Sequence, residues 1–325
     1  MDDKKFASLS PEYKQILTEI GVQLAYRKGI LFERTLLKVW PVVVLLLLGY
    51  ADEYFKDFIN QNSLHTHFTI LFVFCAIFVV FYTTIFGSII EIEKRIWVDS
   101  YFDGKKLNGG QSWKIARRLF WPAFWMYFRI FVRYYLPLVL ILIGFLALYI
   151  IGGVSLVDKL HYLFSPLQMA WIQLILLILP FLLLIGIFLY SYFYLRVRLR
   201  YVWFIFLDTY QKANFSYSVV FEELNKLNSV SKSDSYKKAL ILNLGTDSVN
   251  LVAQVAVGGI SYGISQLGKA GEVVGSVVNV VGKEASHQAT SFANIAAMYI
   301  LYRFALEQMY GEDQEVNENI YKLAE

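Results

Sequence analysis

The sequence predicts an all-α, polytopic membrane protein with about six transmembrane helices and with amphipathic helices at the cytoplasmic surface of the membrane. Of the 325 residues, 57% are apolar and only 17% are charged, whereas soluble domains carry about 25% charged residues. The mean hydropathy of +0.48 agrees with this bias. Long apolar segments also recur along the chain, most of them near the roughly 20 residues that a helix needs to cross a bilayer.

Six segments are predicted to span the membrane because they contain few or no charged residues. The first is short, and it lengthens to 35–51 if the Lys38 amine reaches the headgroups. The next three are rich in Phe and Leu, whereas the last two consist largely of Gly, Ala, Ser, Val and Asn, with Asp247 as their single charge. In chain order the predicted spans are 39–51, 68–90, 134–152, 167–195, 239–268 and 285–302.

Loop charge predicts the orientation, since the side richer in Lys and Arg stays in the cytoplasm. Of the 30 Lys and Arg residues, 26 fall on one side of the six predicted spans. The cationic segments are 1–38, 91–133, 196–238 and the chain after 302. Both termini are therefore predicted to be cytoplasmic.

The chain is predicted to form a single membrane domain, 1–325, that ends in a polar tail, 311–325. The order of its elements also suggests a threefold quasi-repeat. Each unit would contain an amphipathic helix, a span, a short outer loop and a returning span. The predicted units are 10–100, 101–207 and 208–310.

Two groups of cationic and aromatic residues are predicted to lie in the inner headgroup layer. The first belongs to the amphipathic segment 110–130, where indole rings suit the membrane boundary and guanidinium groups suit anionic lipids. The second directly follows the longest span. The alternatives are a dedicated lipid or partner site for the first group and a clamp for a phosphate headgroup for the second. The residues concerned are Trp113, Arg117, Arg118, Trp121, Arg196, Arg198 and Arg200.

A polar seam in the last two spans is the most specific pattern. On the fifth span polar residues recur at steps of 4, 3 and 4, which places them on one face of a helix. On the sixth span they recur at steps of 4 and 3. The seam consists of Asn243, Asp247, Asn250, Gln254, His287, Ser291 and Asn294. Counting from the inner charged ends predicts that Asp247 faces Asn294 and that Gln254 faces His287 in an antiparallel hairpin.

Two interpretations of the seam stay open. An ionisable group such as Asp247 inside a span costs about 2.5–3.5 kcal/mol or more, so it usually faces a bundle interior or water. The seam either joins helices by hydrogen bonds or forms a hydrated path or binding groove. Close backbone approach at Gly259 and Gly263, and at Gly271 and Gly275, would favour joining. Between these spans the Val-rich stretch 273–281 predicts a separate short amphipathic helix on the outer surface, with a cap that dips into the seam as the alternative.

The sequence contains no catalytic motif that we can name. It has no phosphate-binding loop, helical zinc motif or nucleophile elbow, and Cys75 is its single cysteine. His65 and His67 lack the nearby carboxylate or thiol that a zinc site needs. A net charge of +4 does not indicate nucleic-acid binding. We therefore expect no catalysis, no cofactor and no metal.

The expected function is that of a structural or accessory membrane subunit. Such a subunit would pack against membrane lipids, in particular anionic ones, and against a protein partner or a second copy of the chain. The alternative is a small-solute or ion pathway along the polar seam.

Three stretches resemble a known family. They are Ser112-Trp113 at the start of a basic helix that leads into a span, Tyr-Leu-Arg-Val-Arg-Leu at 194–199, and Met-Tyr-Ile-Leu-Tyr-Arg at 298–303. Over 111–310 the chain resembles the six-span membrane domain that is fused to bacterial glycerophosphodiester phosphodiesterases and that also occurs alone in inner-membrane proteins. The resemblance implies a bacterial plasma-membrane protein. It implies no catalytic residue, because that family's chemistry belongs to a separate soluble domain. The Gly-rich last third departs from the Leu- and Phe-rich ending of the family.

Overall fold

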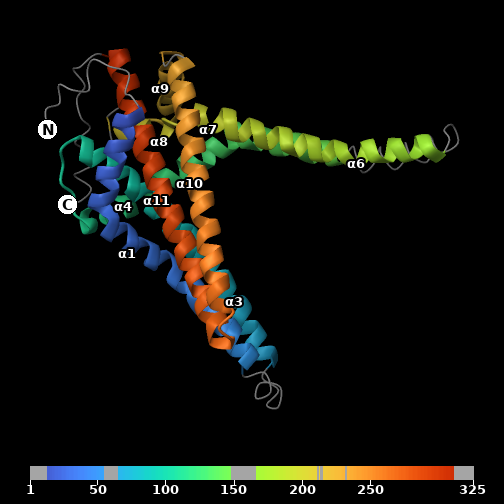
Figure 1. The fold of residues 1–325 in the computed structure, drawn as a ribbon. Coiled ribbons are helices and arrows are strands. Elements are labelled where there is room, and N and C mark those ends of the chain that lie inside the picture. Colours follow the sequence, from blue (N-terminus) through green and yellow to red (C-terminus); the bar gives the residue numbers. More distant parts are fainter. Residues whose placement is uncertain are drawn as a thin grey trace. The chain divides into compact units, whose positions relative to one another are not determined.

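The structure is a computed structural model that describes residues 13–54, 65–147, 166–210, 212, 215–230 and 233–310 (Figure 1). Within these ranges the chain forms helices and short turns and no strand. Among the described residues, four helical segments are long and apolar enough to cross a membrane, namely Thr66–Phe102, Gly109–Ala147, Ile178–Thr209 and Tyr236–Ser265. The protein is therefore an all-α helical membrane protein. The predicted polar tail, 311–325, lies outside the described residues.

The helices follow one another with few breaks. Those with assigned bounds are α1 (Tyr13–Tyr54), α3 (His65–Phe102), α4 (Gly109–Ile130), η2 (Phe131–Tyr135), α6 (Pro166–Leu189), η3 (Tyr190–Leu195), α7 (Arg196–Arg198), α8 (Val202–Thr209), α9 (Tyr217–Val230), α10 (Ser233–Ser265) and α11 (Lys269–Tyr310). The elements η2 and η3 are π-helical turns that continue the helices before them. The predicted span 39–51 lies within the second half of a single helix, α1, which continues through Pro41.

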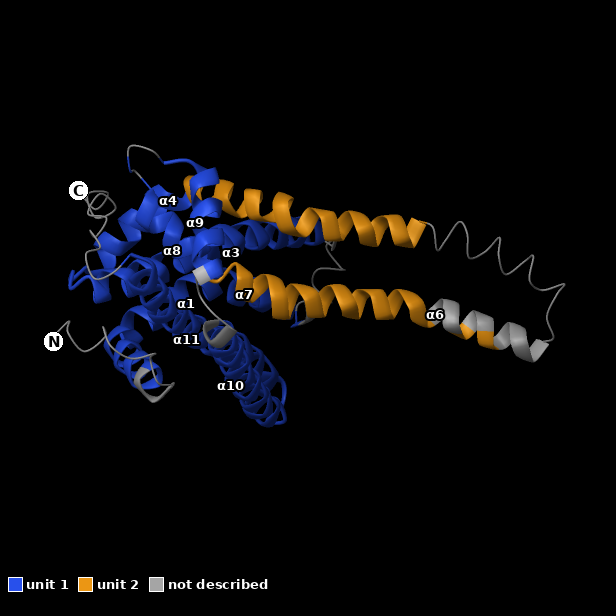
Figure 2. Cartoon of the chain, turned by 90° about the horizontal axis from the view of Figure 1, so that it is seen from above, with its two compact units in different colours: residues 1–120, 201–325 blue, residues 121–200 orange. Residues whose placement is uncertain are grey.

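The chain divides into two compact units (Figure 2). One contains 1–120 and 201–325, and the other contains 121–200. In the second unit α6, η3 and α7 form one uninterrupted helical segment. The threefold quasi-repeat stays a prediction.

In the first unit α11 is the central helix, and it packs against α10, α1, α3 and α9. Its second half carries Tyr299 and Tyr302, which are buried with the ring of Phe204 between α11 and α8. The first half of α11 is rich in Gly, Ala, Ser and Val. Small side chains let helix backbones approach closely, which explains how so polar a helix can occupy the centre of a bundle.

A tight turn joins α10 to α11. α10 ends at Ser265, Gly268 has a φ of 91°, and α11 begins at the next residue. Such a positive φ favours glycine because a Cβ would be strained there. α11 then continues without a break to Tyr310, so the prediction of a separate short helix at 273–281 is wrong. No proline interrupts 269–310, and nothing in that sequence ends a helix.

Candidate functional site

On α10 the polar seam faces α11, as its periodicity predicts. Asn243 is buried, and the next seam residues along α10 are partly buried. The other side of the helix is open, since Val252 and Val255 are 69% and 68% exposed. Polar side chains of α10 are therefore turned toward the bundle, and apolar ones are turned outward.

Glycines bring α10 and α11 into close contact. A Cβ added at Gly275 would lie 2.7 Å from the Ser261 carbonyl oxygen, and one at Gly282 would lie 2.7 Å from a Val257 methyl group. Gly271 is similarly crowded by the backbone of α10. A Cβ added at Gly259 or Gly263 would instead meet no atom within 4 Å, because both glycines lie on the exposed side of α10. Close backbone approach is therefore confirmed for the predicted pair Gly271 and Gly275. For the predicted pair Gly259 and Gly263 the prediction is wrong.

Two hydrogen bonds set the register of this hairpin. Ser286 Oγ donates to Asn250 Oδ1 at 3.1 Å, and Ser261 Oγ donates to the Gly275 carbonyl at 2.6 Å. The same register places Asp247 level with position 289, about 7 Å along the helix axis from the predicted partner Asn294. The prediction that Asp247 faces Asn294 is therefore wrong. It assumed that the charged ends of the two helices lie at equal depth, whereas the turn at Gly268 sets the register.

Ser291 faces α3 and not α10. Its hydroxyl donates to Glu91 Oε2 at 3.1 Å and accepts from Lys94 Nζ at 2.8 Å. Lys94 also pairs with Glu91, and its side chain is fully buried. Asn294, one turn further along α11, has a buried Oδ1 with no hydrogen-bond partner among the described residues. Only part of the predicted seam on α11 thus belongs to the hairpin.

Further charged contacts join α1 to its neighbours. Arg34 Nε donates to Glu93 Oε2 at 2.8 Å, and Ser112 Oγ donates to the other oxygen of that carboxylate at 2.8 Å. Lys38 Nζ lies 2.7 Å from Glu284 Oε1, so this amine binds a carboxylate on α11. Sequence reasoning missed these contacts because it counted the charges of 91–95 and 283–284 as loop charges.

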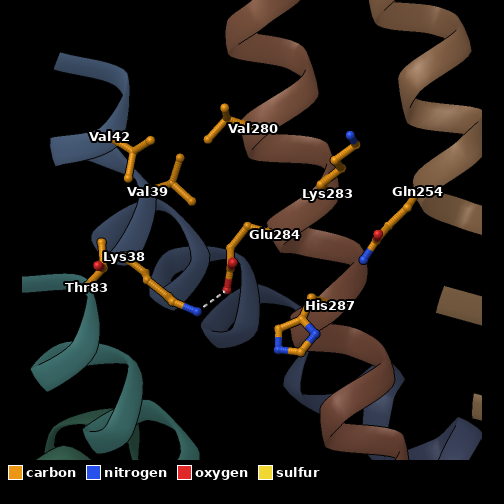
Figure 3. Close-up of a pocket in the computed structure, with 9 residues that line it drawn as sticks. All are labelled: Lys38, Val39, Val42, Thr83, Gln254, Val280, Lys283, Glu284 and His287. Atoms are coloured by element: carbon orange, nitrogen blue, oxygen red, sulfur yellow. Dashed lines mark hydrogen bonds and ion pairs between the residues drawn. The ribbon is translucent and has the colours of Figure 1, made fainter. Parts of the chain in front are cut away.

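A pocket of about 570 Å³ lies next to the Lys38–Glu284 pair (Figure 3). Gln254 and His287 both line it, and Figure 3 shows the Gln254 amide and the His287 ring on either side of one turn of α11. Both residues line this pocket, but the register places Gln254 level with position 282, so the prediction that Gln254 faces His287 at equal depth is wrong as well. Its other polar lining residues are Lys38, Thr83, Lys283 and Glu284, and its apolar wall consists of Val39, Val42 and Val280.

The predicted interfacial residues differ in exposure. Trp113 is half-buried, and the Arg34 guanidinium lies 4.6 Å from the centre of its ring. Arg117, Arg118 and Trp121 are exposed on α4. In the second unit Arg196 lies over the Tyr192 ring at 5.2 Å, and Arg198 donates to the Tyr194 hydroxyl at 2.8 Å.

Arg200 is buried, and its guanidinium donates to the Val197 carbonyl at 2.7 Å. The headgroup role of both groups of residues stays a prediction.

Among the described residues, no group of three or more His, Cys, Asp or Glu side chains could hold a metal ion.

Comparison with known proteins finds no relative of this chain. No family model, no curated protein and no solved structure matches the chain. The resemblance to the six-span membrane domain stays a prediction.

Proposed function

We propose that the protein is an accessory component of a bacterial plasma membrane that binds lipids and a partner protein and catalyses no reaction. One observation carries this proposal: charged and polar groups of the first unit are bonded to each other across helices. Arg34 with Glu93 joins α1 to α3, Lys38 with Glu284 joins α1 to α11, and Lys94 with Ser291 joins α3 to α11. Groups arranged in this way hold a bundle together.

We propose the six-span topology with both termini in the cytoplasm, and helix packing supports the two least apolar of its spans, those in α1 and α11. α1 runs antiparallel to α11, because Tyr50 bonds to Ser276 and Lys38 bonds to Glu284. α1 also packs against α3, and α11 packs against α10. α3 and α10 contain two of the four long apolar segments. If these two helices cross the membrane, the helices packed along them cross it as well.

The outward side of α10 supports contact with lipids or with another protein. Val249, Leu251, Val252 and Val255 are each more than 60% exposed. A continuous apolar surface of this kind on a soluble protein would indicate an interaction site. In a membrane it is covered by acyl chains or by another helix.

Photo-crosslinking tests the proposed partner. A benzoylphenylalanine that replaces Val252 should form a discrete protein adduct in intact cells, because position 252 points out of the bundle. The same group at Ala239, which is buried, should form none. Adducts with lipid alone at Val252 would remove the protein partner from the proposal and leave the lipid contacts.

A small-solute or ion pathway is the second candidate, and the pocket shared by Gln254 and His287 favours it. Flux should then be measurable in proteoliposomes, and Asp247→Asn should abolish it without unfolding the protein. A cysteine at Gln254 in a Cys75→Ser background should also react with a water-soluble thiol reagent. Protection of that cysteine together with no flux for the wild-type chain would exclude the pathway.

A further inference from the structure

The pocket beside Lys38 and Glu284 lies along the apolar parts of the candidate spans. Thr83 belongs to the charge-free stretch 68–90 of α3, and Gln254 belongs to the candidate span Tyr236–Ser265. His287 lies one helical turn, about 6 Å, from Ser291, which bonds to Glu91 where the charges of α3 begin. The polar end of the pocket is therefore close to the level at which the α3 sequence becomes charged.

The polar end of the pocket is cationic. Its single carboxylate, on Glu284, already accepts hydrogen bonds from Lys38 and from Gln288. Lys283 and His287 are exposed, and in the described part of the chain no carboxylate pairs with either of them. Lys38 and Lys283 together carry one more charge than the single Glu284 carboxylate neutralises, so the polar end of the pocket has an excess positive charge.

The opposite wall of the pocket is apolar. Val39 and Val42 come from α1, and Val280 lies two turns before His287 on α11. Figure 3 shows these valines grouped on the side of the pocket away from His287. A cavity that is cationic at one end and apolar at the other fits an amphiphile that carries an anionic head.

A lysine that faces hydrocarbon is costly unless a counter-charge or water accompanies it. An anionic ligand at Lys283 would supply that counter-charge. Gln254 would add an amide donor from the other helix of the hairpin.

We propose that this pocket binds an anionic phospholipid, with its phosphodiester between Lys283, His287 and Gln254 and an acyl chain along Val39, Val42 and Val280. The inference rests on the proposed function only in that the protein is a membrane component in contact with lipids. Free phosphate carries the same charged group as the lipid head, but it has no apolar part that could contact the three valines. The bound species is therefore a lipid.

Native mass spectrometry of the full-length protein tests this site. The chain is reconstituted in nanodiscs of phosphatidylglycerol and phosphatidylcholine, transferred to mild detergent, and the retained lipids are identified. The wild-type chain should retain one phosphatidylglycerol. Lys283→Gln should weaken that retention by about fivefold, and the double variant Lys283→Gln with His287→Gln, which also loses a ring N–H donor, should weaken it further. Lys269→Gln, which removes the charge of the first residue of the same helix, should leave it unchanged.

A second variant tests the apolar wall without any change in charge. Val280→Trp should fill the wall and abolish the retention of phosphatidylglycerol while the melting temperature of the apoprotein stays near the wild-type value. Equal retention in wild type and in the double variant would overturn the proposal. Displacement of the lipid by inorganic phosphate at matched concentration would overturn it as well. Neither result would bear on the adduct at Val252, which tests the protein partner separately.

Discussion

Lys94 shows at the scale of one residue how a charge is kept inside this helical bundle. Its side chain is fully buried between α3 and α11, where it contacts Glu91 and Ser291. Two ions taken out of water gain little net stability as a pair, but removal of one leaves the other uncompensated. The pair is therefore a structural requirement once the helices have packed.

Lys94→Met should lower the free energy of unfolding by about 3–5 kcal/mol, because it leaves the Glu91 carboxylate without its amine. Lys94→Met combined with Glu91→Gln should recover part of that loss. The control is Lys226→Met, since Lys226 is 57% exposed in its pair with Glu223, and exposed pairs contribute about 0–1 kcal/mol. Chemical unfolding in detergent measures all three. Equal effects of Lys94→Met and Lys226→Met would contradict the buried pair.

Glu223 provides a pH-dependent contact between α9 and the end of α11. Burial raises the pKa of Glu223, but hydrogen bonds from Lys226 and Tyr310 outweigh it and hold the pKa below its ordinary value. The stabilisation is therefore complete above the unfolded pKa of about 4.3, and it is lost as the pH falls through the lower folded value.

Burial and the Glu223 contact raise the pKa of Tyr310 to about 12. Tyr310→Phe should lower the melting temperature slightly at pH 7, because it removes a hydrogen bond to a carboxylate. The difference between variant and wild type should shrink below about pH 4, where Glu223 is protonated in the unfolded chain. A difference that is constant with pH would show that the carboxylate is not involved.

At the scale of elements the α10–α11 hairpin depends on positions where a side chain does not fit. A Cβ at Gly275 would lie 2.7 Å from the Ser261 carbonyl oxygen, whose residue also bonds to Gly275. Backbone atoms cannot move aside as a flexible side chain can. The two helices must therefore separate locally if that position is enlarged.

Gly275→Ala should destabilise the protein by about 1–3 kcal/mol through overpacking. Gly259→Ala is the matched control on the exposed side of α10, where nothing lies within 4 Å. It should be neutral, or stabilising by up to about 1 kcal/mol, because alanine is the better helix former. Thermal unfolding in detergent compares the two variants. A reversed order would mean that the hairpin is looser than the structure shows.

The hairpin also shows what a sequence can predict. The helical period of Asn243, Asp247 and Asn250 predicted which face of α10 turns inward, because that face repeats within one element. The register could not be predicted, since it depends on where the turn at Gly268 ends α10. The partner of Ser291 could not be predicted either. Glu91 lies 200 residues away and joins it only when α3 packs against α11.

At the scale of the whole molecule the number of spans depends on α1 and α11. Neither contains one of the four long apolar segments, and α11 carries Glu272, Lys283 and Glu284 within its first half. Lys38 pairs with Glu284, so two of the charges that mark these helices as polar neutralise each other inside the first unit. Composition alone therefore underestimates how well α1 and α11 suit a membrane.

Single cysteines in a Cys75→Ser background test the crossing of α10 and its orientation. Leu267→Cys lies in the turn between α10 and α11, where the native side chain is 79% exposed. It should react with an impermeant thiol reagent added outside intact cells. Asn225→Cys, on the exposed side of α9, should react only after permeabilisation, because α9 precedes α10 on the cytoplasmic side of the predicted topology. Labelling of Asn225→Cys alone from outside intact cells would show the opposite orientation. Labelling of both cysteines from the same side would show that α10 does not cross the membrane.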